Sequence, residues 1–383
     1  MRGLYLDLND NLTSDIISRI SSNSPGGFLF PKLEWLHWGV CDADTALPFF
    51  YLLLSPHLKR VTLYTYSEPS VTPRDQLPAL IQILQVLPTS FEHLSILCGR
   101  EEEEPLSSFV RRCGTSLRSF ETCMPLSEAA IYHLMQLPNL SYWVTVQGPP
   151  RVVPTSIFPS LEGICLDEPE ALPWLQFLAS HEEDAIRNGS ALAGTSHTKV
   201  REKIKFLKFF VCTVDLVSLS PIVKFRNLVA LRIAIFHCPV KCIFLLTDED
   251  MENIVVALPC LKSLRLGKPC RYSTCNATIA SLMSISAHCP DLARLETHFN
   301  TETIVSDVQR LLDGGAGRDK PKCKLRRLVV GELPLYVDHE DLGAVAMGLK
   351  VIFPCLTDFK SSGEGFWDQL KYELGERRDY NQR

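Results

Sequence analysis

A short phrase recurs along most of the chain and constrains its fold more than any other feature. In its clearest copies, residues 31–38 (PKLEWLHW) and 259–266 (PCLKSLRL), one leucine follows the proline by two residues and a second follows it by five. Weaker copies lie between and beyond these two. Such a pattern predicts one structural unit repeated along the chain, in which each copy packs on its neighbours.

The first leucine-like residue of each copy defines the register of the repeats. These residues are Leu33, Leu58, Phe91, Leu117, Leu140, Leu161, Ile204, Leu228, Leu261, Leu292, Leu325 and Leu356. The spacing overlaps and exceeds the period of about 20–29 residues that is typical of leucine-rich repeats. In seven copies a proline stands two residues earlier, where its fixed φ and missing N–H suit the entry to a strand. These prolines are Pro31, Pro56, Pro138, Pro159, Pro259, Pro290 and Pro354.

Apolar stripes at helical spacing lie between the phrases and predict a helix in each unit. The stripes are Met251, Ile254, Val255 and Leu258; Leu80, Ile83, Leu84 and Leu87; Ala130, Leu134 and Leu137; and Ile304, Val308 and Leu311. Thr247, Ser127, and either Thr303 or Ser306 are suited to cap these helices. We therefore expect an α/β leucine-rich-repeat solenoid, with a parallel sheet on its concave side and helices outside it.

The spacing of the copies also predicts the domain organisation. We expect the solenoid to span residues 1–365 and a polar tail to follow over residues 366–383. The longest interval, from Leu161 to Ile204, contains a polar and glycine-containing stretch, and we expect an irregular insertion there at about residues 180–200. The acidic run at residues 101–104 (EEEE) is interpreted as a charged loop.

Composition excludes some classes of partner and location. The 39 basic and 44 acidic residues leave a net charge of −5, which is too balanced to require nucleic acid or a membrane surface as a partner. No run approaches the roughly 18 apolar residues of a membrane span, and Asp7 comes too early for a secretory signal. We expect an intracellular protein, cytoplasmic or nuclear, whose 14 cysteines are reduced thiols.

Four segments carry a resemblance to a known family. They are residues 29–38 (LFPKLEWLHW), 52–58 (LLLSPHL), 246–251 (LTDEDM) and 289–296 (CPDLARLE). Together they resemble the repeat region of the large fungal family of F-box-like leucine-rich-repeat proteins. The resemblance implies a substrate receptor of a cullin ubiquitin ligase, in which an F-box module holds the Skp adaptor and the repeats hold a protein target. Here residues 4–8 (LYLDL) already resemble a repeat strand, so we expect this sequence to lack an F-box module and to bind Skp only if a longer form supplies one.

Strand alternation predicts which side chains face the concave wall. Residues two and four positions after the first leucine point away from the core. The candidates for partner binding are Trp35, His37, Arg60, His93, Tyr142, Lys208, Arg232, Arg265, Arg294, Glu296, Arg327 and Lys360. Since arginine forks match phosphate and carboxylate groups, the basic C-terminal members are interpreted as a surface for an acidic or phosphorylated protein segment. The alternative is that all of these residues are ordinary solvated side chains.

The sequence contains no recognised catalytic motif, and we expect no cofactor. His237, Cys238 and Cys242 precede Cys270 and Cys275 at spacings near the zinc range, although metal-free thiols are the preferred interpretation and we expect no metal. The predicted function is therefore non-catalytic protein recognition, as the target-binding part of an F-box-type ubiquitin ligase receptor. A freestanding repeat scaffold remains an alternative, as does a cytosolic metal-binding protein or hydrolase.

Overall fold

A computed structural model of the 383-residue chain provides the structure. It describes residues 2–6, 19, 28–40, 50–65, 73–97, 103–151, 157–167, 171–187, 200–211, 213–214, 220–235, 243–267, 274–297, 299–300, 303–313, 323–330 and 339–361. The chain forms two compact units, the first made of Met1–Cys165 with Gly194–Val200 and the second of Leu166–Ala193 with Arg201–Arg383.

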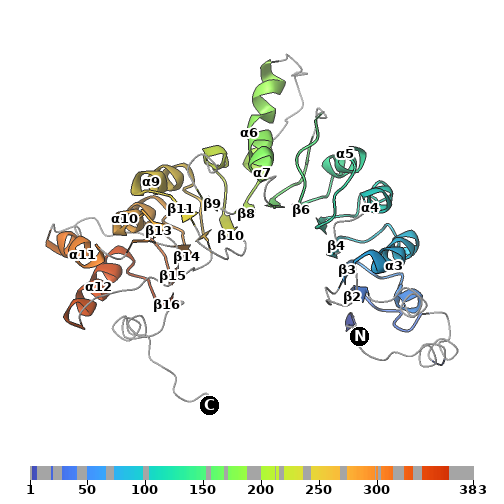
Figure 1. The fold of residues 1–383 in the computed structure, drawn as a ribbon, viewed down its shortest axis with the longest axis horizontal. Helices are drawn as coiled ribbons and strands as arrows, with labels where there is room; N and C mark the ends of the chain where they lie inside the picture. Colours follow the sequence, from blue (N-terminus) through green and yellow to red (C-terminus); the bar gives the residue numbers. More distant parts are fainter. Residues whose placement is uncertain are drawn as a thin grey trace. The chain divides into compact units, whose positions relative to one another are not determined.

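The first unit is built on parallel strands that follow one another in chain order. They are β1 (Gly3–Leu6), β2 (Trp35–Val40), β3 (Arg60–Thr65), β4 (His93–Leu97), β5 (Ser119–Thr122), β6 (Tyr142–Thr145) and β7 (Gly163–Leu166). Three helices, α3 (Pro73–Val86), α4 (Glu103–Val110) and α5 (Glu128–Gln136), connect strands and lie on one side of them (Figure 1). Parallel neighbours need such crossover connections, so the helices cover one face of the strands.

The second unit repeats this plan. Its main strands are β8 (Phe206–Val211), β10 (Ala230–Ile235), β12 (Ser263–Leu266), β14 (Arg294–Thr297), β15 (Arg327–Val330) and β16 (Asp358–Ser361). Its helices are α6 (Ala171–Arg187), α7 (Val200–Lys203), the 3-10 helix η1 (Ser220–Lys224), α9 (Asp248–Ala257), α10 (Ile279–His288), α11 (Ile304–Asp313) and α12 (His339–Ile352). A smaller parallel sheet joins β9 (Thr213–Val214), β11 (Ile243–Phe244) and β13 (Thr274–Cys275). Helices α9 to α12 lie on one side of the main strands (Figure 1).

The predicted repeat register is confirmed by burial. All twelve of the first leucine-like residues are buried, and Leu356, at 7%, is the most exposed of them. Within the strands that follow, buried and half-buried residues alternate, as in β12, where Leu264 and Leu266 are buried while Ser263 and Arg265 are not. Successive side chains of a strand point to opposite faces, so the leucines meet the helices and the other residues face away.

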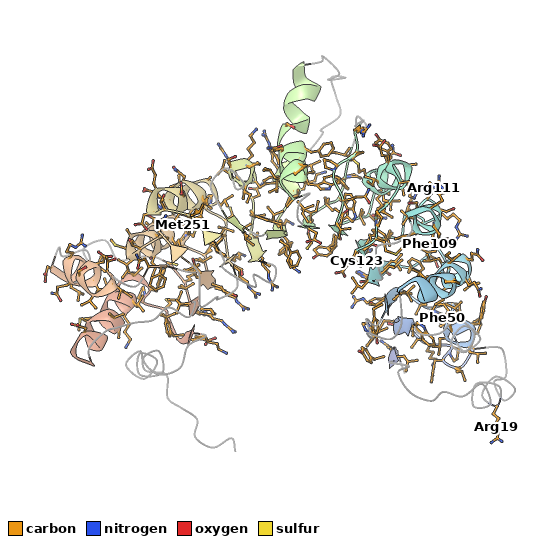
Figure 2. The ribbon with its side chains drawn as sticks, viewed as in Figure 1. Arg19, Phe50, Phe109, Arg111, Cys123 and Met251 are labelled. Carbon is orange, nitrogen blue, oxygen red and sulfur yellow. The ribbon has the colours of Figure 1, made fainter. Side chains whose placement is uncertain are left out.

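The helix predictions are also confirmed. Every residue of the four apolar stripes named above is buried, and Figure 2 shows Phe109 on α4 and Met251 on α9 among the side chains of their units. Thr247 forms a capping box with Asp250 at the start of α9, and the Ser127 hydroxyl accepts a hydrogen bond from the Ala130 N–H at the start of α5. These side chains satisfy backbone N–H groups that the first turn of a helix leaves without partners.

Turns at the predicted prolines lead into the strands, and one hydrogen-bond pattern recurs at these entries. The Lys262 carbonyl accepts hydrogen bonds from the N–H groups of Ala293 and Arg294, at 2.8 and 3.2 Å. The Ala293 carbonyl accepts in the same way from Arg326 and Arg327, at 3.0 and 3.1 Å. Each repeat is thereby held in register with the next before the strand ladder begins.

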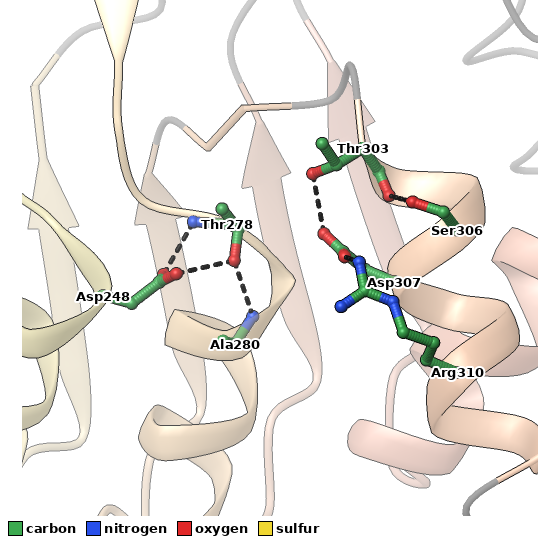
Figure 3. Close-up of polar contacts among 7 residues, drawn as sticks. All are labelled: Asp248, Thr278, Ala280, Thr303, Ser306, Asp307 and Arg310. Carbon is green, nitrogen blue, oxygen red and sulfur yellow. Dashed lines mark hydrogen bonds and ion pairs between the residues drawn. The ribbon is translucent and has the colours of Figure 1, made fainter.

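A carboxylate joins two neighbouring repeats of the second unit on the helix side. Asp248, the first residue of α9, accepts hydrogen bonds from the Thr278 N–H and hydroxyl, both at 2.7 Å (Figure 3). It also accepts from the N–H and hydroxyl of Ser281. Thr278 is itself the N-cap of α10 and receives the Ala280 N–H at 3.2 Å. Asp248 therefore supplies the negative charge that the N-terminus of α10 favours.

The predicted fold class, an α/β leucine-rich-repeat solenoid, is confirmed by the parallel strands and the helices that cover them. The loop predicted over residues 101–104 is wrong in part, because Glu103 and Glu104 begin α4, where acidic residues stabilise the first turn. The extent of the solenoid over residues 1–365 and the insertion at about 180–200 stay predictions. Helix α6 includes residues 180–187, while residues 188–199 and the tail from 366 lie outside the described residues.

Candidate protein-binding surface

The predicted partner-binding residues all lie in strands and face away from the buried leucines. Trp35 and His37 lie in β2, Arg60 in β3, His93 in β4, Tyr142 in β6, Lys208 in β8, Arg232 in β10, Arg265 in β12, Arg294 and Glu296 in β14, Arg327 in β15 and Lys360 in β16. Each is half-buried or exposed. We call the side of the strands that carries them, in either unit, the exposed strand face. Their placement matches the prediction from alternation, and their role in binding stays a prediction.

In the second unit the strand register arranges the exposed strand face into two rows. One row runs Lys208, Arg232, Arg265, Glu296, Val329 and Lys360 through directly paired residues. The other runs Phe206, Ala230, Ser263, Arg294, Arg327 and Asp358. Adjacent strands lie about 4.8 Å apart, so cations that are distant in the sequence become neighbours. Arginine stands directly beside arginine twice, as Arg232 beside Arg265 and Arg294 beside Arg327.

Two carboxylates partly neutralise the end of these rows nearest β16. Glu296 lies 3.8 Å from the guanidinium groups of both Arg265 and Arg294. Asp358 lies 3.2 Å from Nε of Arg327. Sequence reasoning missed Asp358, although it lies two positions after Leu356 and the same alternation rule identifies it.

Electrostatic crowding is greatest at Arg265. Burial lowers the pKa of the Arg265 guanidinium, the charge of Arg294 lowers it further, Glu296 raises it, and Arg232 and Arg327 lower it again. A guanidinium stays protonated in proteins under ordinary conditions. The lowered pKa therefore reflects the burial of Arg265 first and the repulsion from its neighbouring cations second.

In the first unit the exposed strand face is aromatic. The rings of Tyr5 and His37 stack at a centroid distance of 4.4 Å, and the Tyr64 ring lies 4.5 Å from that of His37 and 6.4 Å from that of Tyr5. Trp35 is 42% exposed, and its indole fills the space that a side chain at Gly3 would need. Tyr5 and Tyr64 are absent from the predicted set. Tyr64 follows the buried Leu63 in β3, and Tyr5 lies between Leu4 and Leu6 in β1.

His93 adds no positive charge to this surface near neutral pH. Burial lowers the pKa of His93, Arg60 lowers it further, Glu92 raises it, and Arg118 lowers it again. Two residues after His93 in β4, the Ser95 hydroxyl donates a hydrogen bond to Glu121 of β5 at 3.0 Å. The exposed strand face of the first unit is therefore aromatic and polar, whereas that of the second unit is cationic.

The metal alternative rests largely on residues beyond those that the structure describes. His237, Cys238, Cys242 and Cys270 are outside the described residues, and Cys275 lies in β13. Among the residues that are described, no group of three or more His, Cys, Asp or Glu side chains could hold a metal ion. Cys113, Cys123, Cys165, Cys260, Cys289, Cys323 and Cys355 are free thiols. Within the same described ranges, no helix is both long enough and apolar enough to span a bilayer.

Comparison with known proteins adds little. No protein-family model matches the chain, and no curated protein matches it. Among solved structures, the chain is similar to one in the crystal structure of the yeast Rad7–Elc1 complex, at 18% identity over 80% of this chain and 72% of that chain, with a TM-score of 0.42. It is also similar to a Bacteroides fragilis protein, at 14% identity over 63% of this chain and 66% of that chain, with a TM-score of 0.36. Likeness at this level carries no argument about function.

Proposed function

We propose that this chain is a non-catalytic recognition protein whose exposed strand face binds a protein target. The observation that carries the proposal is the cationic surface of the second unit, where Lys208, Arg232, Arg265, Arg294, Arg327 and Lys360 project from six main strands. These cations belong to a chain with a net charge of −5, so the positive charge is local. Local complementarity of this kind steers and selects an acidic or phosphorylated segment.

The geometry supports an extended segment as the bound form. The rows cross strands that are about 4.8 Å apart, so the six strands present cations over roughly 24 Å. An extended peptide advances about 3.3 Å per residue, and seven or so residues would cover that length. Guanidinium forks placed at regular intervals suit a segment that carries several carboxylates or phosphates.

Binding of an acidic peptide by the whole chain tests this function. We expect a glutamate-rich peptide to bind at low salt in a fluorescence anisotropy assay, and binding to weaken as salt screens the charges. Replacing Arg232, Arg265 and Arg294 together by glutamate should abolish binding. A matched control carries the same number of charge reversals away from the strands, at Arg310, Lys350 and Lys224, which lie in α11, α12 and η1. Equal binding by both triple variants would overturn the proposal.

The more specific proposal is that the target is a substrate of an F-box-type ubiquitin ligase, with this chain as the target-binding part. Its support is the sequence resemblance described above, and a freestanding repeat scaffold is the second candidate. The two differ in one measurable property, which is binding to the Skp adaptor. Co-purification of the Skp adaptor with the chain, or with a longer form that carries an F-box, supports the ligase receptor. Peptide binding without any Skp adaptor binding supports the scaffold.

A further inference from the structure

One part of the cationic surface has fewer compensating carboxylates than the end nearest β16. Lys208, Arg232 and Arg265 lie on β8, β10 and β12 and are directly paired in the strand register. We call these three residues the cation triad. Adjacent members are therefore separated by about one strand spacing of 4.8 Å. Their side chains point to the same face, since paired residues of parallel strands share an orientation.

The triad keeps most of its positive charge available. Arg232 is exposed and forms no ion pair with any carboxylate that the structure describes. The Lys208 ammonium lies 4.5 Å from the centroid of the Phe210 ring, a cation–π contact that holds the side chain without neutralising it. Arg265 has Glu296 at 3.8 Å, but Glu296 is shared with Arg294. By contrast, Arg327 has Asp358 to itself within the described residues, at 3.2 Å.

Small residues flank the two arginines of the triad on both sides. In the preceding row Ala230 and Ser263 lie beside Arg232 and Arg265, next to Phe206. In the following row Ala234 is paired with Phe210. Gly267, two residues after Arg265, has a φ of 82° that a larger residue would adopt only with strain. Nothing bulky therefore stands between the two guanidinium groups and a ligand that approaches them.

An apolar surface lies next to these cations. Phe206 is 46% exposed, and Ala230 beside it in the register is half-buried. Residues two apart in a strand are separated by about 6.6–6.8 Å on the same face. The Phe206 ring is therefore close enough to an anion held by Lys208 and Arg232 for the adjacent residue of a bound segment to contact it.

We propose that the cation triad binds the phosphate monoester of a phosphorylated protein segment, and that Phe206 with Ala230 receives an apolar side chain adjacent to the phosphorylated residue. This inference rests on the proposed function, because it specifies the target that the exposed strand face recognises. It specifies a phosphate at one position of the bound segment and an apolar residue beside that position. The remaining cations of the rows then contact the flanking parts of the segment.

Charge density favours a phosphate over a carboxylate at this position. A phosphate monoester carries between −1.5 and −2 charges on one group near neutral pH and has three strong acceptor oxygens. Two arginine forks and one ammonium supply the matching donors. A single glutamate offers one charge and two oxygens, which leaves part of the triad without a partner.

A protein segment fits the site better than a nucleic acid does. Nucleic-acid surfaces need positive charge along a long and continuous path, because the phosphates are regularly spaced. Here Glu296 and Asp358 interrupt the rows beyond the triad, and both would repel a polyphosphate backbone. An exposed aromatic ring beside a compact cation cluster suits one phosphate with one apolar neighbour.

Short degenerate peptides test the inference with the full chain. One set carries a central phosphoserine with leucine beside it, a second has phosphoserine with glycine beside it, and a third has glutamate in place of phosphoserine with leucine beside it. We expect the first set to bind at least about tenfold more tightly than either of the others, which corresponds to about 1.4 kcal/mol. Fluorescence anisotropy at physiological salt measures the three dissociation constants.

Three single variants locate the site. Arg232→Glu changes an exposed side chain and should reduce the affinity for phosphoserine peptides by about tenfold or more. Lys360→Glu, the same charge reversal four strand steps away, should also reduce it but by no more than about threefold, because Lys360 contacts only a flanking part of the segment. Phe206→Ala should remove the preference for leucine over glycine and leave the preference for phosphate. Far-UV circular dichroism and the unfolding midpoint verify that each variant is folded.

The outcomes separate this inference from the proposed function. If glutamate and phosphoserine peptides bind equally and both depend on Arg232, the phosphate site is wrong and the acidic-segment function stands. If Arg232→Glu and Lys360→Glu weaken phosphopeptide binding equally, the triad is not a distinct site. If no peptide binds, both proposals fail. Tight binding of a single-stranded oligonucleotide in place of every peptide would overturn both and identify a nucleic-acid surface.

Discussion

A close helix contact in the second unit leads to a quantitative prediction about stability. Gly348 lies in α12 and packs against Val308 of α11. A methyl group added at Gly348 would lie 2.6 Å from Cγ1 and 2.9 Å from Cγ2 of Val308. Unstrained carbon–carbon contacts are about 3.5–4.0 Å, so Gly348→Ala forces a displacement of nearly 1 Å. Gly343 lies in the same helix and is exposed, and a methyl group there meets no atom within 4 Å.

Both substitutions gain stability from the replacement of glycine by alanine in a helix, but only Gly348→Ala also loses stability through overpacking. Replacing glycine by alanine in a helix stabilises it by roughly 0.5–1 kcal/mol. Overpacking of a filled core costs typically 1–3 kcal/mol, and Val308 cannot easily move because a β-branched side chain has one strongly preferred rotamer in a helix. We expect Gly343→Ala to raise the free energy of unfolding by roughly 0.5–1 kcal/mol. We expect Gly348→Ala to lower it by up to about 2 kcal/mol.

Urea unfolding followed by circular dichroism measures both variants against the wild type. The difference between the two variants isolates the overpacking cost, because both carry the same glycine-to-alanine change in the same helix. Since cooperativity can be lost in repeat arrays, the slope of the transition should be compared along with its midpoint. A double-mutant cycle adds a sharper test. In a Val308→Ala background the obstructing methyl groups are gone, and Gly348→Ala should become neutral or stabilising, like Gly343→Ala.

The reasoning is refuted if Gly348→Ala stabilises the wild-type chain as much as Gly343→Ala does. That result would mean that α11 and α12 do not approach each other as closely as the contact between Gly348 and Val308 requires. Persistence of the destabilisation in the Val308→Ala background would refute the assignment of the cost to Val308.

Three further predictions concern other parts of the fold. Burial raises the pKa of Asp248, but hydrogen bonds from Ser281 and Thr278 outweigh it and leave that pKa lowered; its stabilisation is therefore complete above the ordinary carboxyl pKa of 3.8 and is lost as the pH falls below it. Asp248→Ala should lower the free energy of unfolding by about 1–2 kcal/mol at neutral pH. In unfolding experiments at acid pH the difference between variant and wild type should narrow, and a difference that stays constant with pH would contradict the prediction. Burial, with nearby Cys323 and Cys260, raises the pKa of Cys289 to about 12. Alkylation of the folded chain at about pH 8 should therefore modify the exposed Cys260 and spare the buried Cys289. Equal labelling of the two cysteines, measured by mass spectrometry, would contradict this prediction. Leu264→Ala removes a fully buried side chain and should lower the free energy of unfolding by about 2–5 kcal/mol in denaturant titration, whereas a loss below 0.5 kcal/mol would mean that the leucine row is not the core.

Much of the candidate surface follows from alternation alone. Trp35, Arg232 and Lys360 face away from the core because each is adjacent in its strand to a buried apolar residue, and successive side chains of a strand point to opposite faces. The same rule identifies Phe206 and Asp358, which are neither cations nor histidines and are absent from the predicted set. Tyr5 was missed for a different reason, since the first strand lacks the proline and the following leucine that identify the other copies.

The sequence by itself determined the repeat unit, the buried leucine row and the residues that face away from it. These properties depend on local periodicity, because a strand alternates every two residues and a helix turns every 3.6, whatever surrounds them. The tertiary structure alone decided which repeats are neighbours in register. Arg265 therefore lies beside Arg232 and Glu296, which are 33 and 31 residues away in the chain, because strand pairing and not chain distance sets their separation. The electrostatic neighbourhood of each exposed side chain, and the close approach of Gly348 to Val308, arise from that packing and leave no signal in the local sequence.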